Sequence, residues 1–596
     1  MLDQARYRVW VEKAATVEAP AAPGRLALMA DAALRLGPRP IALRLADSLL
    51  RRSGVSRARL ADRPSPAGRF LPASAPPAPP LPVWHAARTV QAASALPTRP
   101  DWHGAFPRGL HALSLDLHRH GGARPVWEAN RLASLPLLAQ AARLDPGGAH
   151  LARAEALLGL WCVENPPYRG VAWACGQEAA LRALHLALAL ALLDADRDPP
   201  PGTRALLRLC ARRIAATPLY ALAQDNNHPI SEAAGAYACA LLLGGDAKRA
   251  AATLARRMTR LIAPDGGFAQ LSPGYARLAL DVLSVVEWLR RRHEAPAFPE
   301  ALTVRAAALA TWLHRITDPG TGEPPRLGLE DDSAFADLSL AGRRDARASI
   351  ERGLRLFADC RGDLPHDPGC AWLGLACPDR QPPRPARWQA AGTMGWQQAR
   401  AAAVLRAGPL RFRPGQCDLL HFSLRTARGW LIRDGGTGSY DPPAPWWWSA
   451  LNGAEGHNAP VFDGTEPMPR VGRFLLAAWP RVRRLPHGAA LRDARGHQVT
   501  RSVHVEGDVW TVTDRIAGDF DQVAWHWRLA PGAWRRTENG LAGPGARLEV
   551  TADAPVLLTL EKGWESPAYG TIRPTPLLRV TAGKPVSRVT LAIRLD

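Results

Sequence analysis

The spacing of apolar residues changes once along the chain, and this change constrains the fold more than any other feature. From about residue 110 to residue 356, apolar residues recur at helical spacing, as in QEAALRALHLALALALL and ARLALDVLSVVEWLRRR. After the Pro/Arg-rich stretch RQPPRPARW, apolar and polar residues alternate between Gly-containing turns, as in RSVHVEGDVWTVTDRIAG. The pattern predicts helices first and strands second.

Helical hairpins joined by Pro/Gly turns can close into an α/α toroid, and half-buried strands pack as antiparallel sheets. We therefore expect an N-terminal α/α toroid of helical hairpins over residues 110–385 and a C-terminal antiparallel β-sandwich over residues 386–596. Residues 1–109 are expected to be irregular, with a short helical opening followed by the Pro-rich connector RPSPAGRFLPASAPPAPPLPVW.

The charge balance limits the classes of partner that the chain is expected to bind. The chain has 75 Lys+Arg against 54 Asp+Glu, a net charge of +21, which favours polyanions such as nucleic acid, anionic lipid or acidic polysaccharide. No basic tail, zinc-finger spacing or basic heptad region supports a nucleic-acid partner. The longest apolar run, LHLALALALL, is far too short for a membrane span. The sequence leaves the oligomeric state open.

The cysteines indicate neither disulfides nor a zinc site. The chain has 8 Cys, most of them in apolar helical surroundings, and no C-x-x-C pair, so we expect buried free thiols. Cys360, Cys370 and Cys377 flank His366, but the gaps are longer than those of an ordinary zinc knuckle.

The stretch DNNHPISEAAGAY, from Asp225 to Tyr237, gathers polar residues at the start of a helix. Pro229 suits the first helical position, which makes His228 the expected cap, and Glu232 follows one turn later on the same face. Unpaired N–H groups at a helix start attract anions, so the cluster fits a seat for a substrate anion. The same residues also fit a polar cap with a buried histidine.

Several stretches, taken together, resemble the heparinase II/III family of polysaccharide lyases. They are VWEANRLASLPLLA, ENPPYRGVAWACGQEAALRAL, DNNHPISEAAGAY, APDGGFAQLSPGYARLALD, DLLHFSLRTARGWLIRDGGTGSY and GHNAPVFDG, and they occur in the order found in the family. The resemblance extends from about Trp127 to the end of the chain. It implies a carbon–oxygen lyase that acts by β-elimination on a uronic-acid-containing polymer, such as a bacterial exopolysaccharide or a glycosaminoglycan-like chain.

The resemblance also implies roles for residues of the helical domain. Asn227 is expected to neutralise the substrate carboxylate, with Asn226 as its rival because the Asn doublet leaves the register ambiguous. His228 and Glu232 are expected to orient this Asn or to share its work. In LSPGYARL, Tyr275 is expected to act as base, acid or both.

The neighbours of Tyr275 can also be read from the motif. Ser272 is expected to cap the helix that carries Tyr275, and Pro273 to occupy its first position. Arg277 is expected to lie close to the phenol, to ease its ionisation and to help bind substrate.

The β domain departs from the family pattern. Many members have His residues before the Asp of the strand motif, one catalytic and one holding a metal, where this chain has Pro414 and Gln416. His421 follows a few residues later and is the remaining candidate for a catalytic His. Asp434 and His457 match metal-ligating positions, but Gln416 is a weak third ligand. We therefore expect that no cofactor is required, with a structural divalent metal, Zn or Ca, as the alternative.

Aromatic and basic residues are candidates for sugar binding. Trp447, the centre of the WWW triplet, is expected to form an exposed stacking platform, and Trp173 and Arg182 are expected to line the cleft. Glu178 lies one turn from Arg182 on the predicted helix and is expected to pair with it.

Two other functions fit parts of the sequence. Toroid glycoside hydrolases use paired carboxylates, which Glu330, Asp331 and Asp332 in GLEDDSAF offer, although consecutive acids point in different directions. The missing His residues instead suggest an inactive polysaccharide-binding protein. The first residues, MLDQARYRVWVEKAATVEAP, lack the apolar core of a signal peptide, so a cytoplasmic location is expected, with the periplasm or cell envelope as the alternative.

Overall fold

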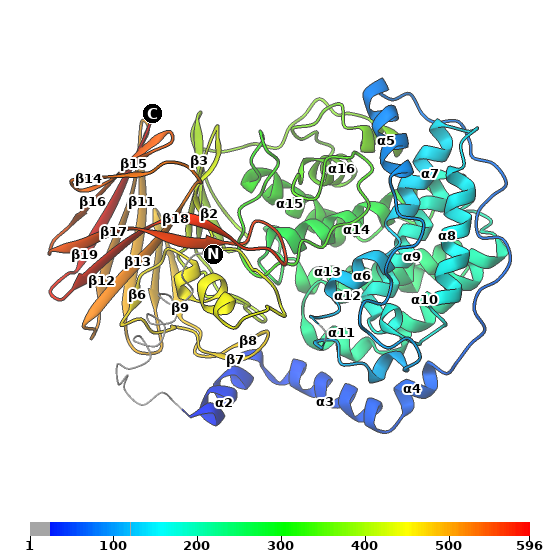
Figure 1. Cartoon of the computed structure of the whole chain (residues 1–596), viewed down its shortest axis with the longest axis horizontal. Coiled ribbons are helices and arrows are strands. Elements are labelled where there is room, and N and C mark those ends of the chain that lie inside the picture. Colours follow the sequence, from blue (N-terminus) through cyan, green and yellow to red (C-terminus); the bar gives the residue numbers. More distant parts are fainter. Residues whose placement is uncertain (1–23, 120) are drawn as a thin grey trace.

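The computed structural model describes residues 24–119 and 121–596, and it places a helical domain beside a β domain (Figure 1). This confirms the predicted class, an α/α toroid followed by an antiparallel β-sandwich. The first strand begins at Arg387, at the end of the Pro/Arg-rich stretch. The first 20 residues, on which the expected location rests, lie outside the described residues.

The toroid is built from short antiparallel helices that pack around one long buried helix. Its helices are α6 (Arg124–Asn130), α7 (Ser134–Leu144), α8 (His150–Glu164), α9 (Gly176–Leu192), α10 (Pro201–Ala216), α11 (Pro218–Gln224), α12 (His228–Leu242), α13 (Ala247–Leu261), α14 (Pro273–Arg292), α15 (Glu300–Ile316), α16 (Arg347–Phe357) and α17 (Pro368–Trp372). Every residue of α9 is buried, which explains why its sequence is apolar on all sides.

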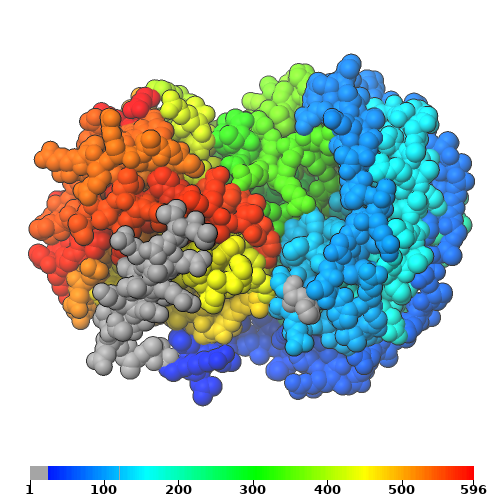
Figure 2. Space-filling model, in the orientation of Figure 1, coloured from blue at the N-terminus to red at the C-terminus, as the bar shows by residue number. Residues whose placement is uncertain are grey.

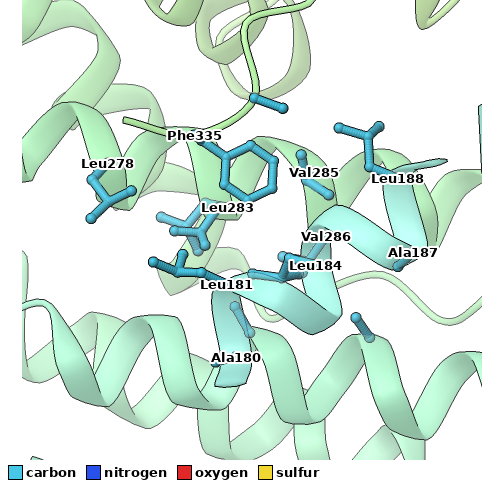
Figure 3. Packing of buried hydrophobic residues seen from close by; sticks show 14 of the residues in the cluster. Ala180, Leu181, Leu184, Ala187, Leu188, Leu278, Leu283, Val285, Val286 and Phe335 are labelled. Atoms are coloured by element: carbon cyan, nitrogen blue, oxygen red, sulfur yellow. The ribbon is translucent and has the colours of Figure 1, made fainter. Parts of the chain in front are cut away.

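The centre of the helical core is the contact between α9 and α14 (Figure 3). Leu181, Leu184 and Leu188 of α9 lie near Leu283 and Val286 of α14, and all are buried. Burying a leucine side chain contributes about 1.5–3 kcal/mol, so this contact holds the two helices that begin beside the site in fixed positions.

The β domain is a sandwich of two antiparallel sheets. One has nine strands in the order β1-β2-β3-β4-β5-β13-β18-β17, with β6 paired to β13, and the other has eight in the order β14-β15-β16-β19-β12-β11-β10-β9. The strands of the first are β1 (Arg387–Ala390), β2 (Thr393–Gln397), β3 (Ala401–Arg406), β4 (Phe422–Thr426), β5 (Gly429–Arg433), β6 (Val461–Phe462), β13 (Gln522–Leu529), β17 (Val556–Glu565) and β18 (Arg573–Gly583).

The strands of the second sheet are β9 (Arg481–Leu485), β10 (Gly488–Arg492), β11 (Gln498–Glu506), β12 (Val509–Ala517), β14 (Arg535–Thr537), β15 (Gly540–Gly543), β16 (Ala546–Ala552) and β19 (Arg588–Leu595). A small separate pair, β7 (Arg470–Gly472) and β8 (Leu475–Leu476), lies toward the helical domain. Strands β11 and β12 alternate buried and exposed residues, as the period of two predicts, because only one face packs on the other sheet.

Residues 25–59 form an arm that runs beneath both domains (Figure 1). The arm consists of α2 (Arg25–Leu36), α3 (Pro38–Arg52) and α4 (Val55–Arg59), and α5 (Val83–Ser94) follows the connector. Helix before the connector was expected only as a short opening in an irregular segment, whereas here it extends over residues rich in Ala, Leu and Arg, all strong helix formers. The Pro-rich connector contains neither helix nor strand as far as Pro82, and its last two residues, Val83 and Trp84, begin α5.

The two domains meet along a furrow between the yellow and red part of the chain and the blue part (Figure 2). No helix in the described part of the chain is long and apolar enough to cross a membrane. The site described next lies where the domains meet.

Candidate active site

A cavity of about 430 Å³ lies between the domains and has walls from both. The toroid contributes the starts of α12 and α14, the arm contributes one face of α3, and the β domain contributes loops. The residues used below that line it are Arg44, Arg51, Arg124, Arg131, Tyr220, Asn226, Asn227, His228, Gln270, Tyr275, Asp331, Arg413, Tyr440, Phe474 and Tyr569. A polymer would therefore contact both domains at once.

The turn before α12 forms one wall of this cavity. Asp225 has φ 44°, a left-handed conformation that is uncommon outside glycine. Its carboxylate accepts hydrogen bonds from Arg260 at 2.7 Å and from Arg39 of the arm at 3.1 Å. These ion pairs hold the turn that presents the next two residues to the cavity.

The two Asn side chains differ in what they can offer a ligand. Asn226 Oδ1 accepts the His228 backbone N–H at 3.0 Å, so it satisfies the start of the helix. Asn227 Nδ2 donates to Gln177 Oε1 at 2.7 Å, and its backbone N–H donates to Gln270 Oε1 at 3.0 Å. A carboxamide has two N–H donors, so Asn227 keeps one for a ligand oxygen. The helix begins at His228 with Asn227 as its cap, one residue earlier than expected.

His228 lines the cavity, whereas Glu232 lies one turn deeper and does not. Burial lowers the pKa of His228, which favours the neutral imidazole. Glu232 packs against Gly176, where an added Cβ would come within 2.6 Å of Oε1, and burial raises its pKa to about 8. The structure therefore places Glu232 beneath the site as a neutral acid, away from any position where it could contact substrate.

Two tyrosine hydroxyls meet in the cavity. Tyr275 Oη, from the first turn of α14, lies 2.6 Å from Tyr440 Oη, from the loop after β5. Ser272 caps α14 as predicted, since its hydroxyl accepts the Tyr275 N–H at 3.4 Å. Burial, with the charge of Asp331, raises the pKa of Tyr275 well above its ordinary value of 10. The expectation that Arg277 eases this ionisation was wrong, because Arg277 points to Ser349.

Tyr440 lines the cavity beside Tyr275, a position that its sequence motif did not indicate. It ends the motif RDGGTGSY, where Gly436 and Gly438 have positive φ and let the loop fold back over the toroid. Its backbone N–H donates to Tyr569 Oη at 3.0 Å, and the two rings pack at 5.3 Å. The only signal in the sequence was a tyrosine after a glycine-rich turn.

The three consecutive acids point in different directions, as the sequence analysis anticipated. Asp331 lines the cavity but is paired with Arg124 at 3.0 Å. Asp332 Oδ2 accepts the Tyr569 N–H at 2.6 Å, and Glu330 packs against Gly274, outside the cavity lining. The pair of free carboxylates that a glycoside hydrolase needs is not formed by these residues.

Three of the predicted substrate-binding residues are part of the protein core. Trp173 and Arg182 have 0% exposure, and the Arg182 guanidinium lies 5.0 Å from the Trp173 ring. Arg182 donates to the Asn130 and Ala172 carbonyls, not to Glu178. In the third case, Trp447 is buried beside Leu451, and the WWW triplet lies outside the cavity lining. These three predictions were wrong because each ring or guanidinium found its partner inside the fold.

Two further expected pairings are replaced by others. Glu178 pairs with Arg131 through two hydrogen bonds of 2.7 and 2.9 Å, both partners being buried. Arg277 donates to Ser349 at 2.9 Å and to the Arg343 carbonyl, so it faces α16 and not the cavity. Residues 275 and 277 lie on opposite sides of one helix, which explains why only the tyrosine reaches the site.

A separate cluster in the β domain has the composition of a metal site. His421, Asp434 and His457 are fully buried, and their ligand atoms lie within 4.8 Å of one another. His457 Nε2 is a buried polar atom without a hydrogen-bond partner, which fits a position facing a cation. Two imidazoles and a carboxylate suit Zn²⁺.

The contacts around this cluster bear on the roles expected of His421 and Gln416. His421 was expected to be catalytic, but it lies outside the cavity lining and contacts Ser423 at 3.0 Å and Asp434 at 3.5 Å. Gln416 was expected to be a weak third ligand; its Nε2 donates to the Gly436 carbonyl at 3.1 Å, and its Oε1 is a buried acceptor without a hydrogen-bond partner among the described residues. His421 joins Asp434 because it immediately precedes β4, whose neighbour β5 carries Asp434 at its end.

Comparisons with known proteins agree with this arrangement. Residues 380–594 match the family model described as Heparinase II/III-like, C-terminal. The crystal structure of heparinase III aligns over 92% of this chain and 91% of its own, with a TM-score of 0.63 and 13% identity. Heparan sulfate lyase HepC from Pedobacter heparinus aligns over 93% and 88%, with a TM-score of 0.53 and 16% identity. Among curated proteins, no sequence matches the chain.

The fold and the interdomain site define a toroid-plus-sandwich protein of the kind found in polysaccharide lyases. The C-terminal domain is a heparinase II/III-like domain, and the resemblance to the heparinase II/III family is confirmed. The two solved structures share 13% and 16% identity with the chain and so show its fold, and the family match covers its C-terminal domain.

Proposed function

We propose that this protein cleaves a uronic-acid-containing polysaccharide by β-elimination. The observation that carries the proposal is the pair of tyrosine hydroxyls, Tyr275 and Tyr440, 2.6 Å apart in a cavity between two domains. Asn227 and His228 line the same cavity. The cavity thus combines proton-transfer groups with donors suited to a carboxylate.

The reaction needs one base and one acid. The base takes the proton from C5 of the uronate, the C5–H electron pair forms the C4–C5 double bond, and the C4–O bond breaks. The acid then protonates the departing 4-oxygen, so atoms and charge balance. Negative charge develops on the carboxylate next to C5, and fixed donors stabilise it.

We assign the proton transfers to the tyrosine pair. Burial raises the pKa of both phenols well above 10, and the nearby Arg124 opposes this for Tyr275. A phenolate at either position accepts the hydrogen bond of the other hydroxyl, a charge-assisted bond that is stronger than a neutral one. One tyrosine can therefore act as base while its partner holds the proton that the leaving oxygen requires.

The remaining roles follow from the contacts. Asn227 donates its free N–H to the substrate carboxylate, and Gln177 and Gln270 fix its orientation. His228, with its lowered pKa, acts as a neutral donor beside it. Glu232 supports the helix start from below. The acidic polysaccharide is the only partner that this scheme requires.

The test is the near-ultraviolet absorbance of the new double bond. Purified protein is mixed with alginate, hyaluronan, heparan sulfate and bacterial exopolysaccharides, and Tyr275→Phe and Tyr440→Phe are measured beside it. We expect rising absorbance with at least one polymer and a loss of about 100-fold or more in kcat for each variant. Trp430→Phe serves as the matched control, since this ring lies outside the cavity lining.

Each other outcome has a clear meaning. New reducing ends without absorbance would show hydrolysis and contradict elimination. Full activity in both phenylalanine variants would remove the tyrosines from the chemistry. Binding without any new chain ends would favour the inactive polysaccharide-binding protein.

A further inference from the structure

The arginines around the cavity are not equivalent. Those that line it are Arg44, Arg51, Arg124, Arg131 and Arg413. The first four have carboxylates nearby: Asp47 lies 3.9 Å from Arg44 and 2.8 Å from Arg51, Asp331 lies 3.0 Å from Arg124, and Glu178 lies 2.7 Å from Arg131. Among the described residues, no carboxylate lies within 4.0 Å of Arg413. One lining guanidinium is therefore left without a counter-charge.

Arg413 is half-buried and faces the tyrosines. Its contact is with the Phe474 ring, whose centroid lies 5.8 Å from the guanidinium carbon. Burial lowers the pKa of Arg413, and the hydroxyls of Tyr220, Tyr275 and Tyr440 partly offset this. A partly desolvated cation without a partner costs free energy that an incoming anion recovers.

The loop between β3 and β4 holds Arg413 in this position. Phe412 has φ 55°, a strained conformation for a large residue, and its ring is stacked with Arg260 at 5.5 Å and Arg411 at 5.1 Å. Gly415 lies so close to Leu329 of the toroid that an added Cβ would come within 2.4 Å of the leucine. The loop is thus fixed at both sides of Arg413, and the guanidinium is pre-positioned.

We propose that Arg413 binds the carboxylate of the uronate that reacts at the tyrosine pair, and so makes the enzyme selective for free acids over esters. The inference rests on the proposed function and extends it to the choice of substrate. A planar guanidinium pairs with a carboxylate through two parallel hydrogen bonds, which a methyl ester cannot accept equally well. Asn227 then acts as the neutral partner, and Arg413 supplies the positive charge.

The first experiment compares substrates and variants. Wild type, Arg413→Gln, Arg413→Lys and Arg413→Ala are assayed on the polymer that the wild type cleaves and on its methyl ester. We expect Arg413→Gln to lower kcat/KM on the free acid roughly 10- to 100-fold, with a much smaller change on the ester. Arg413→Lys should recover part of the loss, and added guanidinium ion should partly restore Arg413→Ala.

The matched control is Arg428→Ala, because Arg428 is exposed, belongs to the same domain and lies outside the cavity lining. It should behave like the wild type on both substrates. An unchanged ratio of acid to ester activity in Arg413→Gln would overturn the proposal. The anions are also compared by how much they raise the melting temperature. If inorganic sulfate raised that of the wild type more than acetate did, and Arg413→Gln lost this difference, the proposal would also be overturned and Arg413 would be identified as a sulfate-binding residue.

A second measurement separates this inference from the proposed reaction. Calorimetry in the Tyr275→Phe background measures binding of uronate tetrasaccharides from alginate, hyaluronan and heparan sulfate, with and without Arg413→Gln. Weaker binding in the double variant supports the assignment even where the wild type produces no absorbance. Equal binding, or no binding by either protein, contradicts it.

Discussion

At the scale of single residues, the sharpest pH dependence comes from Glu232. Burial raises its pKa from 4.5 to about 8, so the folded protein keeps this carboxyl neutral at pH 7 while the unfolded chain ionises it. The unfolded state therefore gains stability as pH rises from about 4.5 to about 8. The stability that depends on a neutral Glu232 is fully present below the pKa of the unfolded chain, 4.5, and is lost as pH rises through the pKa of the folded protein, about 8.

We predict that Glu232→Gln stabilises the protein at neutral and alkaline pH. Glutamine keeps the shape and is neutral at every pH, so it removes a penalty on the order of 3 kcal/mol at pH 7. Chemical denaturation at pH 5 and at pH 8 measures the difference in free energy of unfolding between Glu232→Gln and the wild type. The gain should be small at pH 5 and large at pH 8, and a gain independent of pH would contradict this explanation.

The control for Glu232→Gln is Glu300→Gln, an exposed glutamate at the start of α15. It should change stability little at either pH. If both variants shifted stability equally, the effect would belong to net charge and not to the burial of Glu232.

Single residues also show which positions could be predicted from the sequence and which could not. The capping of α14 by Ser272 follows from local backbone geometry, so it could be predicted. Trp173 and Arg182 could not be assigned, because a ring and a guanidinium suit a sugar cleft and a protein core equally well. Their direction depends on α8 and α9, which enclose them after folding.

At the scale of elements, three loop ends of the β domain meet at His421, Asp434 and His457. These residues lie just before β4, just after β5 and after a short turn at Ala454–Gly456. The strands could be expected from the alternating pattern, but the register that brings His421 to Asp434 depends on a bulge between β4 and β5. The sequence therefore indicated Asp434, His457 and Gln416, but not that His421 lies beside Asp434.

We propose that this cluster holds Zn²⁺, and we predict about one equivalent per chain by elemental analysis. A metal that binds only the folded state stabilises it by about 2.7 kcal/mol at 100 times its Kd. Chelation should therefore lower the melting temperature, and Asp434→Asn should remove both the metal and the effect of the chelator.

The matched control for Asp434→Asn is Asp493→Asn. Asp493 forms a similar pair with His497, 2.7 Å from Oδ2 to Nδ1, in the same domain. This variant should keep its metal. Metal-free wild type with a melting temperature insensitive to chelator would show that hydrogen bonds alone hold the three loops.

At the scale of the whole molecule, the site exists only because two domains meet. Tyr275 and Tyr440 are 165 residues apart, and nothing local in either motif indicates their contact. The order of the domains and their classes followed from hydrophobic period, whereas their relative placement depends on long-range packing. The arm contributes to that placement, since it contacts the β domain at one end and the toroid at the other.

The arm makes specific contacts that can be removed. Asp31 accepts the Ala478 N–H at 2.6 Å, and Arg35 donates to the Trp479 carbonyl at 2.9 Å, so α2 is held on the β domain. From α3, Arg39 reaches Asp225 in the turn before α12. The arm thus links the domain that carries Tyr440 to the turn that carries Asn227.

We predict that the double variant Asp31→Ala/Arg35→Ala lowers kcat/KM roughly tenfold while each domain stays folded. The two anchors contribute about 1 kcal/mol each, which is enough to loosen the contact between domains without unfolding either. Because α3 also lines the cavity, looser binding of polymer should raise KM more than it lowers kcat. Absorbance kinetics measure KM and kcat, and circular dichroism checks that the variant is folded.

Arg25→Ala is the matched control for the arm, because Arg25 is an exposed residue of the same helix. It should leave kinetics and melting unchanged. If the double variant kept wild-type kinetics, the tyrosines would be aligned by the direct interface between the domains alone. If it lost helical signal as well as activity, the arm would be part of the toroid's stability and not only of the alignment of its site.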